Sequence, residues 1–185
     1  MRFEKRIKNI QVALSNIDQS LTHVLEFGVF TGRTIKYIRE NLPKNDFSVF
    51  GFDTFTGLPE DWEQAGVKKG LFDCDGNIPD VEDVAFYKGL FKDTIPKYLA
   101  EARPIAFIHV DSDLPSSARL ILNSLTQNIV KGTVILFDDW EVKGKANESL
   151  VFYDWVVDNN IEYEEIEPII KEGGQKIIKI TGAKK

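Results

Sequence analysis

The feature that most constrains the fold is a near-continuous apolar run, P-I-A-F-I-H-V, at Pro104–Val110. A strand with one solvated side alternates between apolar and polar residues, whereas a parallel strand covered by helices on both faces does not. We therefore expect this strand at the centre of a parallel sheet. Parallel neighbours need long crossover connections, usually helices, so the run also predicts an α/β fold.

Strands and helices alternate along the rest of the chain. Further strands are predicted at Val24–Phe27, Phe47–Phe52, Val84–Lys88, Gly132–Phe137, Ile161–Ile166 and Lys176–Thr181. Helices are predicted over residues 1–20, 33–41, 94–101, 115–128 and 148–158, with Asn147 as the cap of the last one. The last two predicted strands, Ile161–Ile166 and Lys176–Thr181, follow each other without a helix between them. The pattern favours a Rossmann-like, doubly wound sheet that is mostly parallel, with an antiparallel edge strand at the C-terminus.

Composition excludes several classes of protein. The 185 residues are most simply one domain, 1–185. A net charge of −6 without a Lys/Arg stripe argues against a nucleic-acid partner. No apolar run approaches the roughly 20 residues of a membrane span, and the start M-R-F-E-K-R is not a signal peptide. The single cysteine, Cys74, excludes an internal disulfide. We predict a cytoplasmic globular protein, and leave open whether it forms a homo-oligomer.

A glycine-bearing turn follows the first strand and reads E-x-G-x-x-x-G from Glu26 to Gly32. A strand, a glycine turn and a helix form the local geometry that holds a nucleotide-like ligand in α/β proteins. The turn is not the dinucleotide fingerprint G-x-G-x-x-G, because Glu26 and Thr31 stand where two of those glycines belong.

Acidic residues stand at the ends of four predicted strands, at Glu26, Asp53, Asp111 and the pair Asp138-Asp139. Open α/β sheets bind their ligands outside the carboxyl ends of the strands, so these side chains are expected around one crevice. Like charges that lie close together repel, and a cation or the hydroxyls of a ligand would relieve the repulsion. Asp53 lies about 20 residues beyond the turn, where an acidic side chain binds ribose hydroxyls. The alternative for Asp53 is a turn cap.

The later acids indicate a metal site. Asp111, Asp138 and Asp139 would supply carboxylate oxygens to a hard cation of the Mg²⁺ type. The alternative is that the Asp pair caps the segment that follows it. We interpret Glu26 as facing the amino group of the ligand, or else as a solvated turn residue. His109 is interpreted as a core histidine rather than a base.

The segment 56–80 is too long and too polar for a simple connector. We predict a mobile loop over the site, with disorder as the alternative. Within it, D-C-D-G-N at Asp73–Asn77 fails the spacing of a calcium loop. Trp140 is expected to line the substrate pocket or to pack in the core. The sequence contains no G-x-S-x-G, P-loop or H-E-x-x-H motif, which argues against the common classes of hydrolase and kinase.

Five motifs between Val24 and Trp140 are familiar as a set. They are E-F-G-V-F-T-G, F-D-T-F-T-G-L-P, K-G-L-F-K-D-T-I-P, F-I-H-V-D-S-D-L and V-I-L-F-D-D-W. In this order they resemble the S-adenosylmethionine-dependent methyltransferases of the macrocin O-methyltransferase type. The resemblance implies a class I methyltransferase fold with seven strands, S-adenosylmethionine as cofactor and Mg²⁺ as metal. The chain departs from this family at Pro115, where a tyrosine is usual.

The resemblance also implies roles for individual residues. The cofactor would be surrounded by Glu26, Gly28, Thr31, Gly32 and Asp53, with Gly89, Leu90 and Phe91 near the adenine. The metal ligands would be Asp111, Asp138 and Asp139, with Asp111 also in the position of the base for the substrate hydroxyl. The implied reaction is O-methylation of a small molecule or sugar. The alternatives are a Rossmann-type nucleotide- or NAD-binding enzyme and an inactive cofactor-binding module.

Overall fold

The computed structural model describes residues 2–170 and 174–183. Residue 1, residues 171–173 and residues 184–185 of the predicted domain lie outside that range. In chain order the elements are α1 (Arg2–Leu14), β1 (His23–Phe27), α2 (Arg33–Glu40), β2 (Ser48–Asp53), β3 (Val84–Lys88), α3 (Phe91–Leu99), β4 (Ile105–Val110), α4 (Pro115–Leu125), β5 (Val134–Phe137), β6 (Glu141–Val142), β7 (Lys145–Ala146), α5 (Glu148–Asn159), β8 (Ile161–Ile166) and β9 (Lys176–Ala183). None of these helices is long and apolar enough to cross a membrane.

Within the described ranges, seven strands form one sheet in the order β3-β2-β1-β4-β5-β9-β8. Strands β1 to β5 are parallel, and β9 is antiparallel to both β5 and β8. The predicted mostly parallel sheet with an antiparallel strand at its C-terminal edge is confirmed. The outermost strand is β8, and β9 lies between it and β5. The apolar residues of β9, Ile177, Ile178 and Ile180, are buried, whereas β8 alternates with exposed glutamates and suits a sheet edge.

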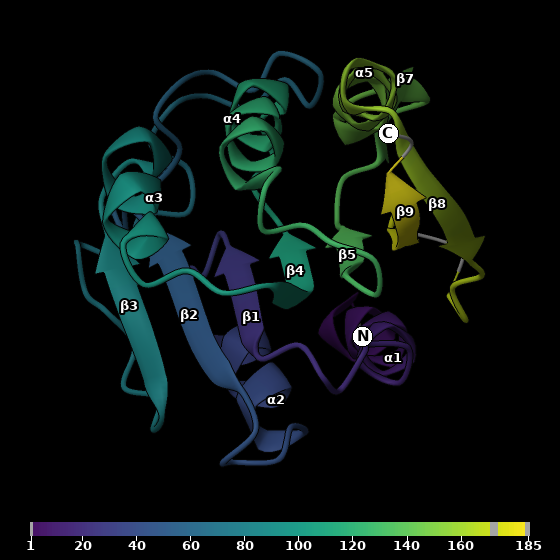
Figure 1. Cartoon of the computed structure of the whole chain (residues 1–185). Coiled ribbons are helices and arrows are strands. Elements are labelled where there is room, and N and C mark those ends of the chain that lie inside the picture. The colour runs from purple at the N-terminus through teal and green to yellow at the C-terminus, as the bar shows by residue number, and fades with distance from the viewer. Residues whose placement is uncertain (1, 171–173, 184–185) are drawn as a thin grey trace.

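Helices cover both faces of the sheet, with α3, α4 and α5 on one side and α1 and α2 on the other (Figure 1). Side chains alternate between these faces along each strand. On β1, Leu25 and Phe27 pack with α3, α4 and α5, and Val24 packs with α1 and α2. This double cover explains why β1 and β4 are buried along their whole length, as the central apolar run predicts.

Several predicted boundaries differ from the structure. Helix α1 ends at Leu14 rather than at residue 20, and the segment after it contains side-chain bonds such as Asp18 accepting from Ser20, which compete with helical pairing. Helix α3 begins at Phe91 rather than at residue 94, with Pro96 inside it. Strand β5 begins at Val134, and the short β6–β7 hairpin was not predicted.

Candidate functional site

A pocket of about 780 Å³ opens where the carboxyl ends of the parallel strands meet. Its volume lies in the range of sites for small molecules and cofactors. Each of the five parallel strands ends in or is followed by residues that line the pocket, including Gly28 and Phe30, Asp53 and Thr54, Leu90 and Phe91, Asp111 and Asp113, and Asp139. The glycine turn therefore shares one pocket with Asp53, Asp111 and Asp139, whereas Asp138 does not line it. Gly89, which the resemblance places near the adenine, directly precedes two of the lining residues.

The glycine turn is packed tightly against the end of β4. Gly28 has a φ of +92°, and a Cβ added there would lie 1.8 Å from the carbonyl oxygen of Asp111. Gly32 has a φ of +79°, and its added Cβ would lie 2.6 Å from the Cβ of Pro79. Thr31 is exposed and is not among the lining residues. Only a residue without a side chain fits at Gly28, so turn and acidic cluster lie in direct contact.

Asp53 holds the glycine turn in place. Its Oδ2 accepts hydrogen bonds from the backbone N–H groups of Val29, at 2.8 Å, and Phe30, at 2.7 Å. Its Oδ1 accepts from the N–H of Phe55 at 2.8 Å. The predicted turn cap is thus present. Asp53 also lines the pocket, and of the four lone pairs on its carboxylate oxygens these three bonds leave one, on Oδ1, for a ligand hydroxyl.

Glu26 is buried inside β1, which makes the solvated-turn interpretation wrong. It is the register partner of His109 on β4, and its Oε1 lies 2.8 Å from His109 Nδ1. His109 is also buried, as expected of a core histidine. Burial disfavours the imidazolium, but Asp138 and Glu26 outweigh it and raise the pKa of His109 to about 10. Glu26 does not line the pocket, so its role toward a ligand remains a prediction.

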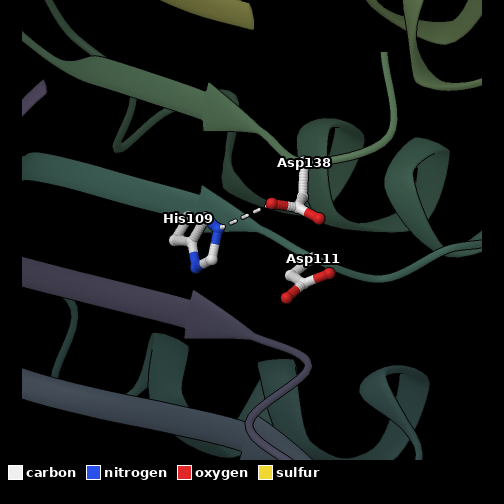
Figure 2. A group of neighbouring side chains, drawn as sticks. All are labelled: His109, Asp111 and Asp138. Carbon is white, nitrogen blue, oxygen red and sulfur yellow. Dashed lines mark ion pairs between the residues drawn. The ribbon is translucent and has the colours of Figure 1, made fainter. Parts of the chain in front are cut away.

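The potential metal ligands at the strand ends form two groups that share Asp111. One group is His109, Asp111 and Asp138, which Figure 2 shows together at the ends of β4 and β5. The other is Asp111, Asp113 and Asp139. In each group, one potential ligand atom per residue lies within 4.8 Å of the others. The predicted ligands Asp138 and Asp139 thus fall into different groups, because successive residues at a strand end point to opposite faces.

Crowding and burial shift the pKa values of these acids in opposite directions. Burial, followed by the charge of Asp138, raises the pKa of Asp111 well above its ordinary range. Burial and Asp139 raise the pKa of Asp113 to about 8. Burial would also raise the pKa of Asp138, but His109 and Arg6 outweigh it and lower that pKa. A group of carboxylates that resist ionising together fits a hard divalent cation, whose charge would remove the penalty.

Arg6 on α1 contacts this cluster, and the sequence did not indicate it. Its Nη2 pairs with Oδ2 of Asp138, an otherwise unbonded and fully buried atom. Its Nη1 lies 3.5 Å from Oδ2 of Asp111. On the other side of Asp138, Gln175 Nε2 donates to Oδ1 at 2.6 Å. No local pattern links residues so far apart in the chain, so only the tertiary structure reveals these contacts.

Glu148 and Asn147 support the cluster from the start of α5. Glu148 is buried, and its Oε2 accepts from the backbone N–H of Asp139 at 3.1 Å. Asn147 stands at the N-cap position, but its side chain makes no capping hydrogen bond, so the predicted cap is wrong. Its Nδ2 instead donates to the carbonyl oxygens of Asp113, at 2.9 Å, and Asp139, at 3.1 Å. The amide of Asn147 therefore ties the chain after β4 to the chain after β5.

The segment 56–80 folds over one side of the pocket. Leu58 and Trp62 are buried with Leu114 in a small apolar cluster, and Trp62 Nε1 donates to Asn147 Oδ1 at 3.3 Å. The mobility that we predict for the segment 56–80 remains a prediction. Trp140 lies among the aromatic rings of Phe137 and Phe152 and is not a lining residue, so it packs in the core.

Comparison with known proteins identifies the family. A search of curated proteins gave no match. The family described as "Methyltransferase domain" matches residues 25–140, which is more than half of the chain. The chain belongs to this family. It is therefore a methyltransferase that uses S-adenosylmethionine, and the nicotinamide alternative is set aside.

Solved structures of methyltransferases share the fold. The calicheamicin methyltransferase CalS11 matches with a TM-score of 0.73 over 95% of this chain and 79% of that chain, at 18% identity. The O-methyltransferase NovP matches with a TM-score of 0.70 over 96% of this chain and 80% of that chain, at 19% identity. The O-methyltransferase from Bacillus cereus, in complex with S-adenosylhomocysteine, matches with a TM-score of 0.61 over 98% of this chain and 81% of that chain, at 14% identity. The class I methyltransferase fold expected from the motifs is confirmed.

Proposed function

We propose that this methyltransferase transfers the methyl group of S-adenosylmethionine to a hydroxyl oxygen of a small molecule or sugar, with the help of Mg²⁺. The observation that carries the proposal is the contact between the glycine turn and the acidic cluster at Gly28 and Asp111. Gly28 and Asp53, from the proposed cofactor set, line the same pocket as Asp111 and Asp139, from the proposed metal set. Transfer requires the acceptor oxygen and the methyl carbon to be held together, and such positioning accounts for much of the rate enhancement.

The cofactor half of the site consists of the turn and the residues that follow β2 and β3. Asp53 holds the turn through Val29 and Phe30 and would accept a ribose hydroxyl with the one lone pair that is left on its Oδ1. Leu90 and Phe91 line the pocket and would contact the adenine. Glu26, Gly28, Thr31, Gly32 and Gly89 complete the proposed set of cofactor residues.

The metal half consists of the carboxylates. We retain Asp111, Asp138 and Asp139 as ligands, and add Asp113 because it groups with Asp111 and Asp139. When bound, a divalent cation would lower the pKa of the acceptor hydroxyl. Asp111 remains our candidate for accepting the hydroxyl proton, since it lines the pocket and its backbone contacts the cofactor turn. Glu148 and Asn147 keep the backbone of the ligands in place.

The lining supports a small-molecule acceptor. Beyond the carboxylates it is largely apolar, with Leu58, Trp62, Leu71 and Phe72 from the segment over the pocket. The net charge of −6 also argues against a nucleic-acid acceptor. A cytoplasmic location remains part of the proposal. Among the proteins of this fold, CalS11 is described as a TDP-rhamnose 3′-O-methyltransferase. A sugar or phenol with neighbouring hydroxyls is therefore our preferred acceptor class.

The test compares Asp139→Asn with Asp154→Asn, a partly exposed aspartate on α5 that pairs with Arg119. Methyl transfer to a panel of sugars and phenols is measured over a range of Mg²⁺ concentrations. We expect Asp139→Asn to lose Mg²⁺-dependent turnover by about 100-fold or more while still binding S-adenosylhomocysteine. Asp154→Asn should behave like the wild type. Unchanged Mg²⁺-dependent turnover in Asp139→Asn would show that the metal assignment is wrong.

A further inference from the structure

Arg6 stands on the face of the sheet to which Asp138 and His109 point. Alternation along β4 places His109 and Asp111 on the same side as Phe107, which packs with α1 and α2. The guanidinium pairs with Asp138 and lies 3.5 Å from Asp111, so it bridges the ends of β4 and β5. The Arg6 side chain is 28% exposed and lines the pocket, whereas that of Asp138 is fully buried.

We propose that Arg6 is a built-in counter-cation of the carboxylate cluster, which a divalent cation must displace from Asp111 and Asp138 in order to bind. The proposal rests on the proposed function in one respect, since it assumes that the cluster binds such a cation. It adds that the site has two alternative occupants, one of which belongs to the chain. Loading of the metal is then coupled to the position of the Arg6 side chain.

The geometry favours competition over cooperation. The guanidinium pairs with Oδ2 of Asp138 and lies near Oδ2 of Asp111, and both residues offer ligand atoms to a cation. A guanidinium and a divalent cation that share the same carboxylates repel each other, and the burial of Asp138 strengthens that repulsion. Arginine keeps its charge in proteins, so the guanidinium cannot give way by losing a proton. Displacement of the Arg6 side chain is therefore the remaining way for a cation to reach both carboxylates.

Helix α1 itself is anchored, which confines the displacement to the side chain. Asn9 lies one turn beyond Arg6 and is fully buried. It exchanges two hydrogen bonds with the backbone of Ile170, each of 2.9 Å, and its Nδ2 donates to Gln175 Oε1 at 2.8 Å. Gln175 in turn donates to Asp138. The helix therefore stays beside the cluster while the partly exposed Arg6 side chain is free to swing into the pocket.

The first test measures binding of Mg²⁺ and Mn²⁺ to the intact protein by calorimetry. Arg6→Ala should bind both ions about tenfold or more tightly than the wild type, because the competing charge is gone. The ion affinity of Arg6→Lys should lie between those of the wild type and Arg6→Ala. The matched control is Lys8→Ala, which removes the same charge from an exposed position on the same helix and should change the affinity less than about twofold. Unchanged or weaker binding in Arg6→Ala overturns the proposal.

A second test needs no variant and holds even if Arg6→Ala fails to fold. In arginine-labelled wild-type protein, saturating Mg²⁺ should shift the guanidinium NMR signals of Arg6. The internal control is Arg39, whose guanidinium is fixed by the carbonyl oxygens of Phe47, Leu42 and Pro43 and should not respond. Saturation with Mg²⁺ that leaves the Arg6 signals unchanged overturns the proposal.

The proposed function is tested separately by S-adenosylhomocysteine binding and by methyl transfer with and without EDTA. If neither the wild type nor Arg6→Ala binds either ion, the proposal about Arg6 fails, while cofactor binding and metal-independent transfer still report on the methyltransferase reaction. If Arg6→Ala gains ion affinity but no acceptor is methylated, the displacement stands and the assigned reaction fails.

Discussion

Gly28 offers the sharpest prediction, because it is the point where the glycine turn touches the acidic cluster. In Gly28→Ala the new methyl carbon would lie 1.8 Å from the carbonyl oxygen of Asp111, whose chain cannot rotate away as a flexible side chain would. The residue also has a φ of +92°, which strains any residue with a Cβ. The glycine turn and the end of β4 must therefore move apart in this variant.

The expected loss of stability follows from three contributions. The left-handed backbone costs about 1–2 kcal/mol for an alanine. Crowding a packed region costs a further 1–3 kcal/mol or so. Separation also weakens the hydrogen bond from Asp111 N–H to the Phe27 carbonyl, now 2.9 Å, for about 1 kcal/mol. We expect a loss of about 3–6 kcal/mol, a large part of the stability of a typical domain.

The assay is urea unfolding together with calorimetry of S-adenosylhomocysteine binding. The control is Gly144→Ala in the β6–β7 turn, where φ is +71° but no atom lies within 4 Å of the added Cβ. The control carries the backbone strain alone, so it should lose only about 1–2 kcal/mol and keep cofactor affinity. Equal losses in the two variants would refute the close packing of the turn against Asp111.

Three further predictions concern residues around the site and the core. Glu148→Gln keeps an acceptor for the buried N–H of Asp139 and should unfold in urea within about 1 kcal/mol of the wild type, whereas Glu148→Ala should lose about 2–4 kcal/mol. Asp53→Asn weakens the bonds to the turn, and calorimetry should show S-adenosylhomocysteine affinity reduced about tenfold or more. Burial, followed by the charge of Arg103, lowers the pKa of His23 below 6.5, so the unfolded chain binds the extra proton. Stability is therefore lost as pH falls below about 6.5, and His23→Gln should flatten that slope in unfolding curves at several pH values.

Much of the fold was predictable because it depends on local patterns. The buried run of β4 and the alternation of strands and helices gave the sheet and its order of elements. Helix ends were less predictable, since side-chain bonds after α1 and the proline inside α3 compete with helical pairing. The place of β9 inside the sheet depends on which of two neighbouring strands is more apolar.

The site was predictable where the topology alone brings residues together. Asp53, Asp111 and Asp139 follow parallel strands and meet in the pocket for that reason. The pairing of Glu26 with His109 depends on strand register, which the sequence does not show. Arg6 approaches the acids from a helix on one face of the sheet, so no spacing in the chain indicated it.

The most direct test of the proposed function follows an isotope-labelled methyl group from S-adenosylmethionine. The protein is incubated with sugars and phenols that carry neighbouring hydroxyls, either with Mg²⁺ or with EDTA, and the products are analysed by mass spectrometry. We predict label on an oxygen of at least one acceptor in Mg²⁺, loss of transfer in EDTA and recovery when Mg²⁺ is restored. Protein that binds S-adenosylhomocysteine regardless of Mg²⁺, yet methylates none of these acceptors, would contradict the account.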